Sequence, residues 1–287
     1  YGVVVHENEV IMFAEFIDGG TLAEVIAKYA EDRALYGDTD DIVKGIDIHN
    51  SLFLYQQILT VLNYFLQSDV QVLHEDIKAD NVMIRAETSE LVLVDFGLAR
   101  HLPANGKVPG GESPSGAQTH WSPEKAASEG HSFPSDWWAA TCVLLECITT
   151  KPPWLTRYNH LKMLHFVIKM YSPPIEDVPA NLDVVVRDLI KDAWTIDPNV
   201  RPPPLQQAKH PAFAKYGVPY MIEDDPDGAA AMRQNDSGSV ASSAGAENIH
   251  SSGSSTITSQ QSLTSDPAPQ VPTTRRKKSD VANAELQ

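Results

Sequence analysis

Two short apolar runs open the chain and predict a β-hairpin. Residues 2–5 and residues 10–14 are apolar, and a short polar stretch separates them. Paired apolar runs around a polar turn are typical of antiparallel strands. The Asp-Gly-Gly sequence at residues 18–20 should end the extended segment, because glycine readily adopts turn conformations. A helix is then expected from Thr21, since Glu24 three residues later completes a capping box.

Apolar residues at helical spacing predict most of the other elements. From Ser51 they recur every three or four positions, which indicates a helix with one buried stripe. Residues 135–148 are apolar nearly all round and therefore predict a buried central helix. Helical spacing returns over residues 182–193, and the prolines at 202–204 should open a last short helix. Residues 91–94 predict a strand.

Polar segments lie between and after these elements. The acidic residues 38–41 and the Gly-, Pro- and Ser-rich residues 103–118 predict two loops. Past residue 222 aromatic residues vanish and small polar residues dominate, so this tail cannot bury enough apolar surface to become ordered. The basic cluster at residues 275–278 is interpreted as a solubilising patch, with a nuclear-import signal or a basophilic-kinase site as alternatives.

Composition narrows the class of protein. The chain has 287 residues, 42% of them hydrophobic, and can bury a sizeable core. Its formal net charge of −16 argues against nucleic acid as a partner. No apolar run approaches the roughly 18–20 residues of a membrane span and no signal peptide opens the chain, so no membrane partner is expected. Cys142 and Cys147 are interpreted as core residues in a reducing compartment, the cytoplasm or alternatively the nucleus.

The candidate chemistry lies in the loop LHEDIKADNVMI at residues 73–84. Asp76 and Asn81 are five residues apart, and Asp95 follows fourteen residues later, after a predicted strand. Phosphoryl transfer needs a carboxylate that accepts the substrate proton, a cation near the γ-phosphate and oxygen ligands for Mg²⁺. Asp76, Lys78 and the pair of Asn81 and Asp95 match these three needs. Because D-x-x-x-x-N and D-F-G occur together across a strand, solvated loop residues are the weaker interpretation.

These motifs resemble those of eukaryotic serine/threonine protein kinases, from Tyr1 to about Phe213. Residues 74–81 resemble the catalytic loop, Asp95-Phe96-Gly97 the metal-binding motif and residues 122–124 the end of the activation segment. The resemblance implies that Asp136 braces the backbone of the catalytic loop and that Arg201 pairs with Glu124. It assigns structural roles to His74, Phe96, Gly97, Glu124, Asp136 and Arg201.

The resemblance also implies ATP and Mg²⁺ as cofactors. Ala14 falls at the gatekeeper position, and its small side chain should open a pocket behind the adenine. The carbonyl of Glu15 and the backbone of Ile17 are expected to bond the adenine edge, and Met83 to pack beneath the ring. The expected nucleotide-contacting residues are therefore Ala14, Glu15, Ile17, Lys78, Asn81, Met83 and Asp95.

The implied fold class is α+β, with the two lobes of a protein kinase. Residues 1–17 are expected to be a remnant of the small β lobe and hinge, residues 18–215 the mainly helical large lobe, and residues 222–287 a disordered serine-rich tail. The glycine-rich loop, the strand lysine and its partner glutamate would precede Tyr1. Because that lysine–glutamate pair is needed for activity, the chain by itself is expected to be an inactive fragment.

Shorter stretches suggest a branch and a substrate. "IKADN", "GAQTHWSPE", "KPPWLTRY" and "SPPIEDVP" resemble the MAP kinase kinase kinases that include the NF-kappa-B-inducing and tumour-progression-locus kinases. The implied partner is a protein substrate, another kinase in a MAP kinase-type cascade; no oligomeric state is predicted. A non-catalytic kinase-fold scaffold (a pseudokinase) is the main alternative, and a kinase of small molecules is a second. The presence of Asp76, Asn81 and Asp95 weighs against the scaffold.

Two residues depart from the kinase pattern. Glu75 replaces the arginine that would bind a phosphate on the activation segment, and its carboxylate should repel such a phosphate. Phosphorylation of Ser113 or Ser115 is therefore not expected to activate the protein by that route. Ala117 stands where a threonine usually reaches Asp76, which removes one hydrogen bond.

Overall fold

The computed structural model of the chain describes residues 2–7, 9–36, 44–67, 70–102, 106–111, 113–155, 157–158 and 164–222. The acidic residues 38–41, the tail beyond residue 222 and the basic cluster lie outside these residues. Within them, helices predominate, and the strands form three two-stranded antiparallel sheets. None of the helices in these ranges is long and apolar enough to cross a membrane.

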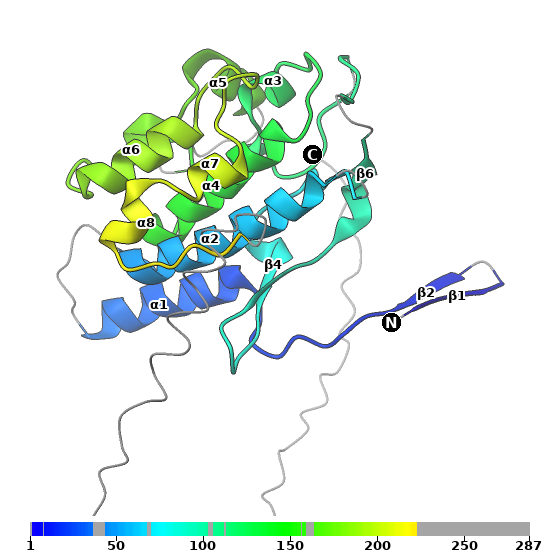
Figure 1. Ribbon diagram of the computed structural model, residues 1–287, viewed down its shortest axis with the longest axis horizontal. Helices are drawn as coiled ribbons and strands as arrows, with labels where there is room; N and C mark the ends of the chain where they lie inside the picture. Colours follow the sequence, from blue (N-terminus) through cyan, green and yellow to red (C-terminus); the bar gives the residue numbers. More distant parts are fainter. Residues whose placement is uncertain are drawn as a thin grey trace, which may run out of the picture. The chain divides into compact units, whose positions relative to one another are not determined.

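The predicted hairpin is confirmed. Strand β1 (Gly2–His6) pairs with β2 (Glu9–Phe13) in a register that runs from Gly2 opposite Phe13 to His6 opposite Glu9. These strands are the dark-blue pair in Figure 1. Every residue of both strands is exposed, on either face of the ribbon. Backbone pairing, rather than burial of side chains, therefore defines this element.

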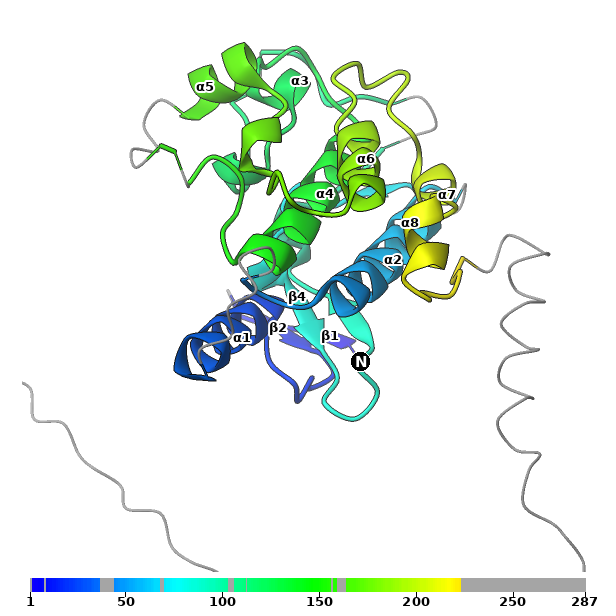
Figure 2. The ribbon, with the colours of Figure 1, turned by 90° about the vertical axis from the view of Figure 1, so that its left-hand side faces the viewer.

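Helices α2 (Ile48–Phe65) and α4 (Pro134–Thr149) form the centre of the core and lie side by side (Figures 1 and 2). Thirteen of the sixteen residues of α4 are buried, which confirms the predicted central helix. Cys142 and Cys147 on α4 are free and buried, as expected. Helix α2 begins three residues before the predicted Ser51, because Asp47 caps it by accepting a hydrogen bond from the Asn50 amide at 3.0 Å.

The remaining helices surround this pair. Helix α1 (Leu22–Tyr36) begins at the predicted capping box, in which the Thr21 amide bonds Glu24 at 2.8 Å and the Glu24 amide bonds Thr21 at 3.2 Å. The helix predicted after the prolines is α7, but it is not the last, because Pro211 opens one more turn of helix behind the His210 cap. The other helices are α3 (Pro123–Ala126), α5 (Leu164–Tyr171), α6 (Val184–Ala193), α7 (Pro204–Gln207) and α8 (Pro211–Lys215).

Short strands and 3₁₀ turns position the polar loop. Strand β4 (Val82–Ile84) pairs with β5 (Leu91–Leu93), which is one residue shorter than predicted, and β3 (Val72–Leu73) pairs with β6 (Arg100–His101). The two pairs bring the segments before and after the strands together, so that the Val94 amide donates to the Asn81 carbonyl at 2.9 Å. The 3₁₀ helices are η1 (Ala79–Asn81), η2 (Phe96–Leu98), η3 (Gln118–His120) and η5 (Ile175–Asp177).

Candidate active site

Two polar side chains of the loop between β3 and β4 converge on the carboxylate of a third, Asp76. Asp76 is 7% exposed, and its Oδ2 accepts a hydrogen bond from Lys78 Nζ at 2.8 Å. Asn81 Nδ2 donates to the same oxygen at 2.9 Å and to the Asp76 carbonyl at 2.8 Å. The 3₁₀ turn η1 produces this arrangement, because it folds Asn81 back toward Asp76. Sequence reasoning placed these three residues in one site, and the structure brings them together.

The environment of Asp76 favours its ionised form. Burial by itself would raise the pKa of this carboxyl group, but hydrogen bonds from Lys78 and from the Ala117 amide, with the Lys78 charge, outweigh burial and lower the pKa. The Ala117 amide donates to Oδ1 at 2.8 Å. Both carboxylate oxygens are therefore oriented, and the group is present as the base that proton transfer requires.

Asp95 lies next to Asn81 across the paired strands. Its backbone is left-handed, with φ of 61°, and its exposed carboxylate accepts a bond from the Gly97 amide at 3.2 Å. Both bonds from the Asn81 side chain to Asp76 use Nδ2, so neither of them occupies its amide oxygen. An amide oxygen and a carboxylate suit Mg²⁺, which takes one or two protein ligands with phosphate and water oxygens. No all-protein metal cluster occurs among the described residues, and this donor set fits a shared Mg²⁺.

Asp136 at the start of α4 holds the backbone of the loop. Its Oδ2 accepts the His74 amide at 2.6 Å and its Oδ1 accepts the Glu75 amide at 3.1 Å. The carboxyl group is fully buried, and burial raises its pKa. The ring of Phe96 packs against the rings of His74 and Phe65, with centroid distances of 4.9 and 6.0 Å. The D-F-G segment therefore contacts both the loop and α2.

The expected ion pair between Arg201 and Glu124 is present. Arg201 donates two hydrogen bonds to the carboxylate, at 2.8 and 3.0 Å, and both side chains are buried. The guanidinium also lies over the Trp138 ring, 4.9 Å from its centroid. The pair therefore fixes α3, at the end of the activation segment, to the helical core.

The segment between β2 and α1 lies against β4. The Ile84 amide donates to the Gly20 carbonyl at 3.0 Å, and Thr21 bridges to Met83. A side chain at Gly19 would meet the Ile84 carbonyl, since a Cβ there would lie only 2.1 Å from that oxygen. Met83 thus lies beside the segment that leads from the expected hinge into α1, and Ile17 of that hinge is buried. Ala14 and Glu15 are exposed, and the carboxylate of Glu15 pairs with Arg85 at 3.0 Å. The assignment of these residues to adenine contacts stays a prediction.

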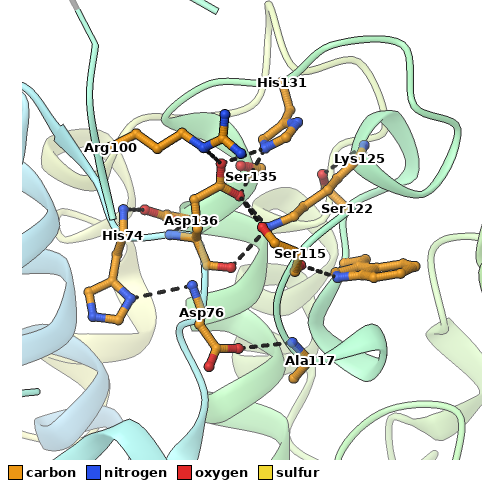
Figure 3. A network of polar contacts seen from close by, with 12 residues as sticks. His74, Asp76, Arg100, Ser115, Ala117, Ser122, Lys125, His131, Ser135 and Asp136 are labelled. Atoms are coloured by element: carbon orange, nitrogen blue, oxygen red, sulfur yellow. Dashed lines mark hydrogen bonds and ion pairs between the residues drawn. The ribbon is translucent and has the colours of Figure 1, made fainter. Parts of the chain in front are cut away.

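Sequence reasoning missed the environment of Glu75. Its side chain is fully buried, with Lys125 Nζ at 2.5 Å, the His131 ring nitrogen Nε2 at 2.9 Å and Arg100 Nε at 3.4 Å (Figure 3). Burial alone would raise the pKa of Glu75, but hydrogen bonds and charges from His131 and Lys125 outweigh it and lower the pKa to about 2. The one indication in the sequence was an acidic residue at position 75, inside the catalytic loop. If that loop is buried, its carboxylate requires charged or hydrogen-bonding partners.

Comparison with known proteins identifies the family. Residues 1–213 match the family model of the protein kinase domain, and the chain belongs to that family. It is a serine/threonine kinase domain that resembles the MAP kinase kinase kinase group. The α+β fold class predicted for a two-lobed protein kinase is therefore confirmed.

The relatives are modest in identity and longer than the chain. Identity is 29% over 217 residues with mitogen-activated protein kinase kinase kinase 8 of Rattus norvegicus, covering 74% of this chain and 42% of that protein. It is 24% over 214 residues with mitogen-activated protein kinase kinase kinase 2 of Arabidopsis thaliana, covering 73% and 29%. It is 24% over 218 residues with mitogen-activated protein kinase kinase kinase 1 of Homo sapiens, covering 74% and 13%. The chain thus spans less than half the length of each of these three relatives.

Proposed function

We propose that the protein transfers the γ-phosphoryl group of ATP to serine or threonine hydroxyl groups of other proteins. The observation that carries the proposal is the convergence of Lys78 and Asn81 on the buried, ionised Asp76, beside Asp95. What separates Asp76 from the buried carboxylates of Glu75 and Asp136 is its neighbours, a lysine and an amide side chain that accompany the metal-binding motif and that phosphoryl transfer requires. The same arrangement is what a general base for a hydroxyl group requires.

The chemistry follows from the positions of these groups. The substrate oxygen forms a bond to the γ-phosphorus, the bond to the β–γ bridging oxygen breaks, and the hydroxyl proton passes to the Asp76 carboxylate. Lys78 places a positive charge beside the phosphoryl group, while Asn81 holds Asp76 in position. Asn81 and Asp95 would hold Mg²⁺, which when bound neutralises charge on the phosphates. ADP is the leaving group.

The proposed acceptor is another kinase in a MAP kinase-type cascade. Supporting it are the names of the relatives, which are mitogen-activated protein kinase kinase kinases from rat, Arabidopsis and human. ATP is proposed to lie between the 14–17 segment and Met83, where the segment that follows β2 contacts β4. The cytoplasm is the proposed location, since both cysteines of the described core are free.

Phosphotransfer from radiolabelled ATP tests the proposal. The chain is expressed by itself and behind the small-lobe segment of a known protein kinase, and a catalytically dead MAP kinase kinase serves as acceptor. Replacing the base, Asp76→Asn, should lower the rate about 10²–10⁴-fold, the usual contribution of a general base. Asp80→Asn is the matched control, because Asp80 lies in the same loop, four residues after Asp76, but is exposed.

The control should retain the wild-type rate within about twofold, since exposed substitutions away from the site have small effects. Equal rates for Asp76→Asn and Asp80→Asn would contradict the assignment of the base. Binding of Mg·ATP without transfer by either form would instead favour the non-catalytic scaffold.

A further inference from the structure

The buried carboxylate of Glu75 joins the catalytic loop to four other segments of the chain. Glu75 lies in the catalytic loop, Arg100 in β6 just after D-F-G, Ser115 in the activation segment, Lys125 in α3 and His131 before α4. Their contacts to Glu75 range from 2.5 Å for Lys125 Nζ to 3.4 Å for Arg100 Nε and Ser115 Oγ. Figure 3 shows these side chains pointing toward the one carboxylate from different sides. We call these five residues the Glu75 clamp.

We infer that Glu75 is a positioning residue, whose carboxylate holds the activation segment in place over Asp76 without any added phosphate. The inference rests on the proposed phosphotransfer and concerns the regulation of that site. The Glu75 carboxylate supplies the negative charge that compensates the buried Lys125 ammonium and the nearby Arg100 guanidinium, and it also bonds the buried His131 ring. No covalent modification is required to bring them together, because the anion is part of the chain.

The clamp reaches the base through the backbone. Lys125 Nζ donates to the carbonyl of Glu75 at 2.9 Å as well as to its side chain. Gly116 has φ of +77°, and a Cβ there would lie 2.5 Å from the same Glu75 carbonyl. The next residue, Ala117, donates its amide to Asp76 at 2.8 Å. Loosening the clamp would therefore move the amide that orients and helps to ionise Asp76.

Other contacts tie the far side of the clamp to the activation segment. His131 pairs with Val108 in an isolated bridge, in which the Val108 amide donates to the His131 carbonyl at 2.8 Å. Trp121 Nε1 donates to the Ser115 carbonyl at 2.7 Å. Asp136 accepts the His74 and Glu75 amides, so Glu75 is held through its main chain as well as through its side chain. The segment therefore has few ways to adjust if the carboxylate loses its charge.

Hydrogen exchange in the intact chain tests the positioning role without requiring catalysis. The variant Glu75→Gln keeps the shape and removes the charge. The Ala117 amide should then exchange about tenfold faster or more, the effect of losing a hydrogen-bonded charge. Glu75→Asp keeps the charge, and its Ala117 amide should exchange at a rate between those of the wild type and Glu75→Gln. Glu129→Gln is the matched control, because Glu129 follows α3 but is exposed, and it should leave exchange unchanged.

Kinetics of the form active in phosphotransfer give the second readout. Glu75→Gln should lower kcat about tenfold or more while the Kd of Mg·ATP stays within twofold, because the clamp acts on Asp76 and not on the nucleotide. The inference is overturned if the exchange rate of the Ala117 amide and the kcat are both unchanged. It is also overturned if exchange rises equally throughout α4, because this would show a general loss of stability. If exchange responds but wild-type protein transfers no phosphate, the proposed function fails and the clamp remains.

Discussion

The hairpin and the catalytic loop are held by opposite means. In the hairpin, five residues of each strand pair in a simple register and every side chain is exposed. In the catalytic loop, residues 73–77 are all buried, and residues 74–76 are bonded by side chains from α3 and α4 and by a backbone amide of the activation segment. An isolated two-stranded hairpin is marginally stable, whereas a buried polar loop is rigid when every group has a partner.

The comparison shows where the chemistry can be placed accurately. The hairpin orients nothing by burial, so substitutions on its faces change few contacts within the described residues. The backbone of the loop before Asp76 is held by bonds from residues up to 62 positions away, as in the case of Asp136. Groups that must be positioned for reaction lie in the region where tertiary contacts, rather than local pairing, set the backbone.

The largest expected effect contrasts two arginine–carboxylate pairs. Arg201→Met removes a buried pair and should lower the free energy of unfolding by about 3–5 kcal/mol, because Glu124 stays buried without its partner. Arg85→Met removes the partly exposed pairs with Glu15 and Glu90 and should cost much less, because solvent screens exposed charges. Urea denaturation at neutral pH measures both changes. Equal losses would show that the two regions are not held differently.

A second difference should appear with pH. The pKa of Glu75 is lowered from 4.5 to about 2, so its stabilising contribution is complete above pH 4.5 and is lost as the pH falls toward 2. A shift of this size corresponds to about 3 kcal/mol. The difference in unfolding free energy between wild type and Glu75→Gln should therefore shrink between pH 5.5 and pH 2.5. Glu9→Gln on the exposed hairpin should show no such trend.

Two glycines give a smaller and closely matched contrast. Gly116→Ala forces a side chain into a left-handed backbone against the Glu75 carbonyl and should destabilise the protein by about 2 kcal/mol. Gly2→Ala on the hairpin meets no atom within 4 Å and should be neutral within about 0.5 kcal/mol. Thermal unfolding of the two variants measures the contrast. A neutral Gly116→Ala would mean that the activation segment is not pressed against the loop.

The smallest effect concerns the departure at Ala117. A threonine at this position would add a hydroxyl beside Asp76, and Ala117→Thr should raise kcat by about tenfold at most, the value of one hydrogen bond. The Ala117 amide already orients Asp76, which limits the gain. Ser113→Thr is the control, because Ser113 is exposed in the same segment. A fall in kcat for Ala117→Thr would show that the loop has no room for the hydroxyl.

Local chemistry made much of the fold predictable. The capping box at Thr21 and the apolar pattern of α4 act within a few residues, and both predictions are confirmed. The errors are also local in origin. The start of α2 was placed at Ser51 because apolar periodicity marks the buried stripe and not the cap at Asp47. The extra helix after α7 was missed because it has only five residues.

The residues of the candidate site also divide into those that local sequence could group and those that it could not. Asp76, Lys78, Asn81 and Asp95 belong to motifs with fixed spacing, so sequence alone could group them. The basic side chains around Glu75 are 25 to 56 residues away along the chain and share no periodic pattern with it. Sequence reasoning therefore considered only the repulsion between Glu75 and a phosphate, and not the positive groups that neutralise it. Long-range partners of a buried charge become visible only when the chain is folded.

The burial of Glu75 has a consequence for how long the arrangement persists. A phosphate ester is made by a kinase and hydrolysed by a phosphatase, so an arrangement that depends on a phosphate can be formed and reversed by enzymes. A glutamate is incorporated at translation and is not removed by a phosphatase. Its contacts can lapse only through local opening, which in proteins takes microseconds to seconds, and they form again each time the segment closes. The activation segment of such a protein would carry no record of past signals.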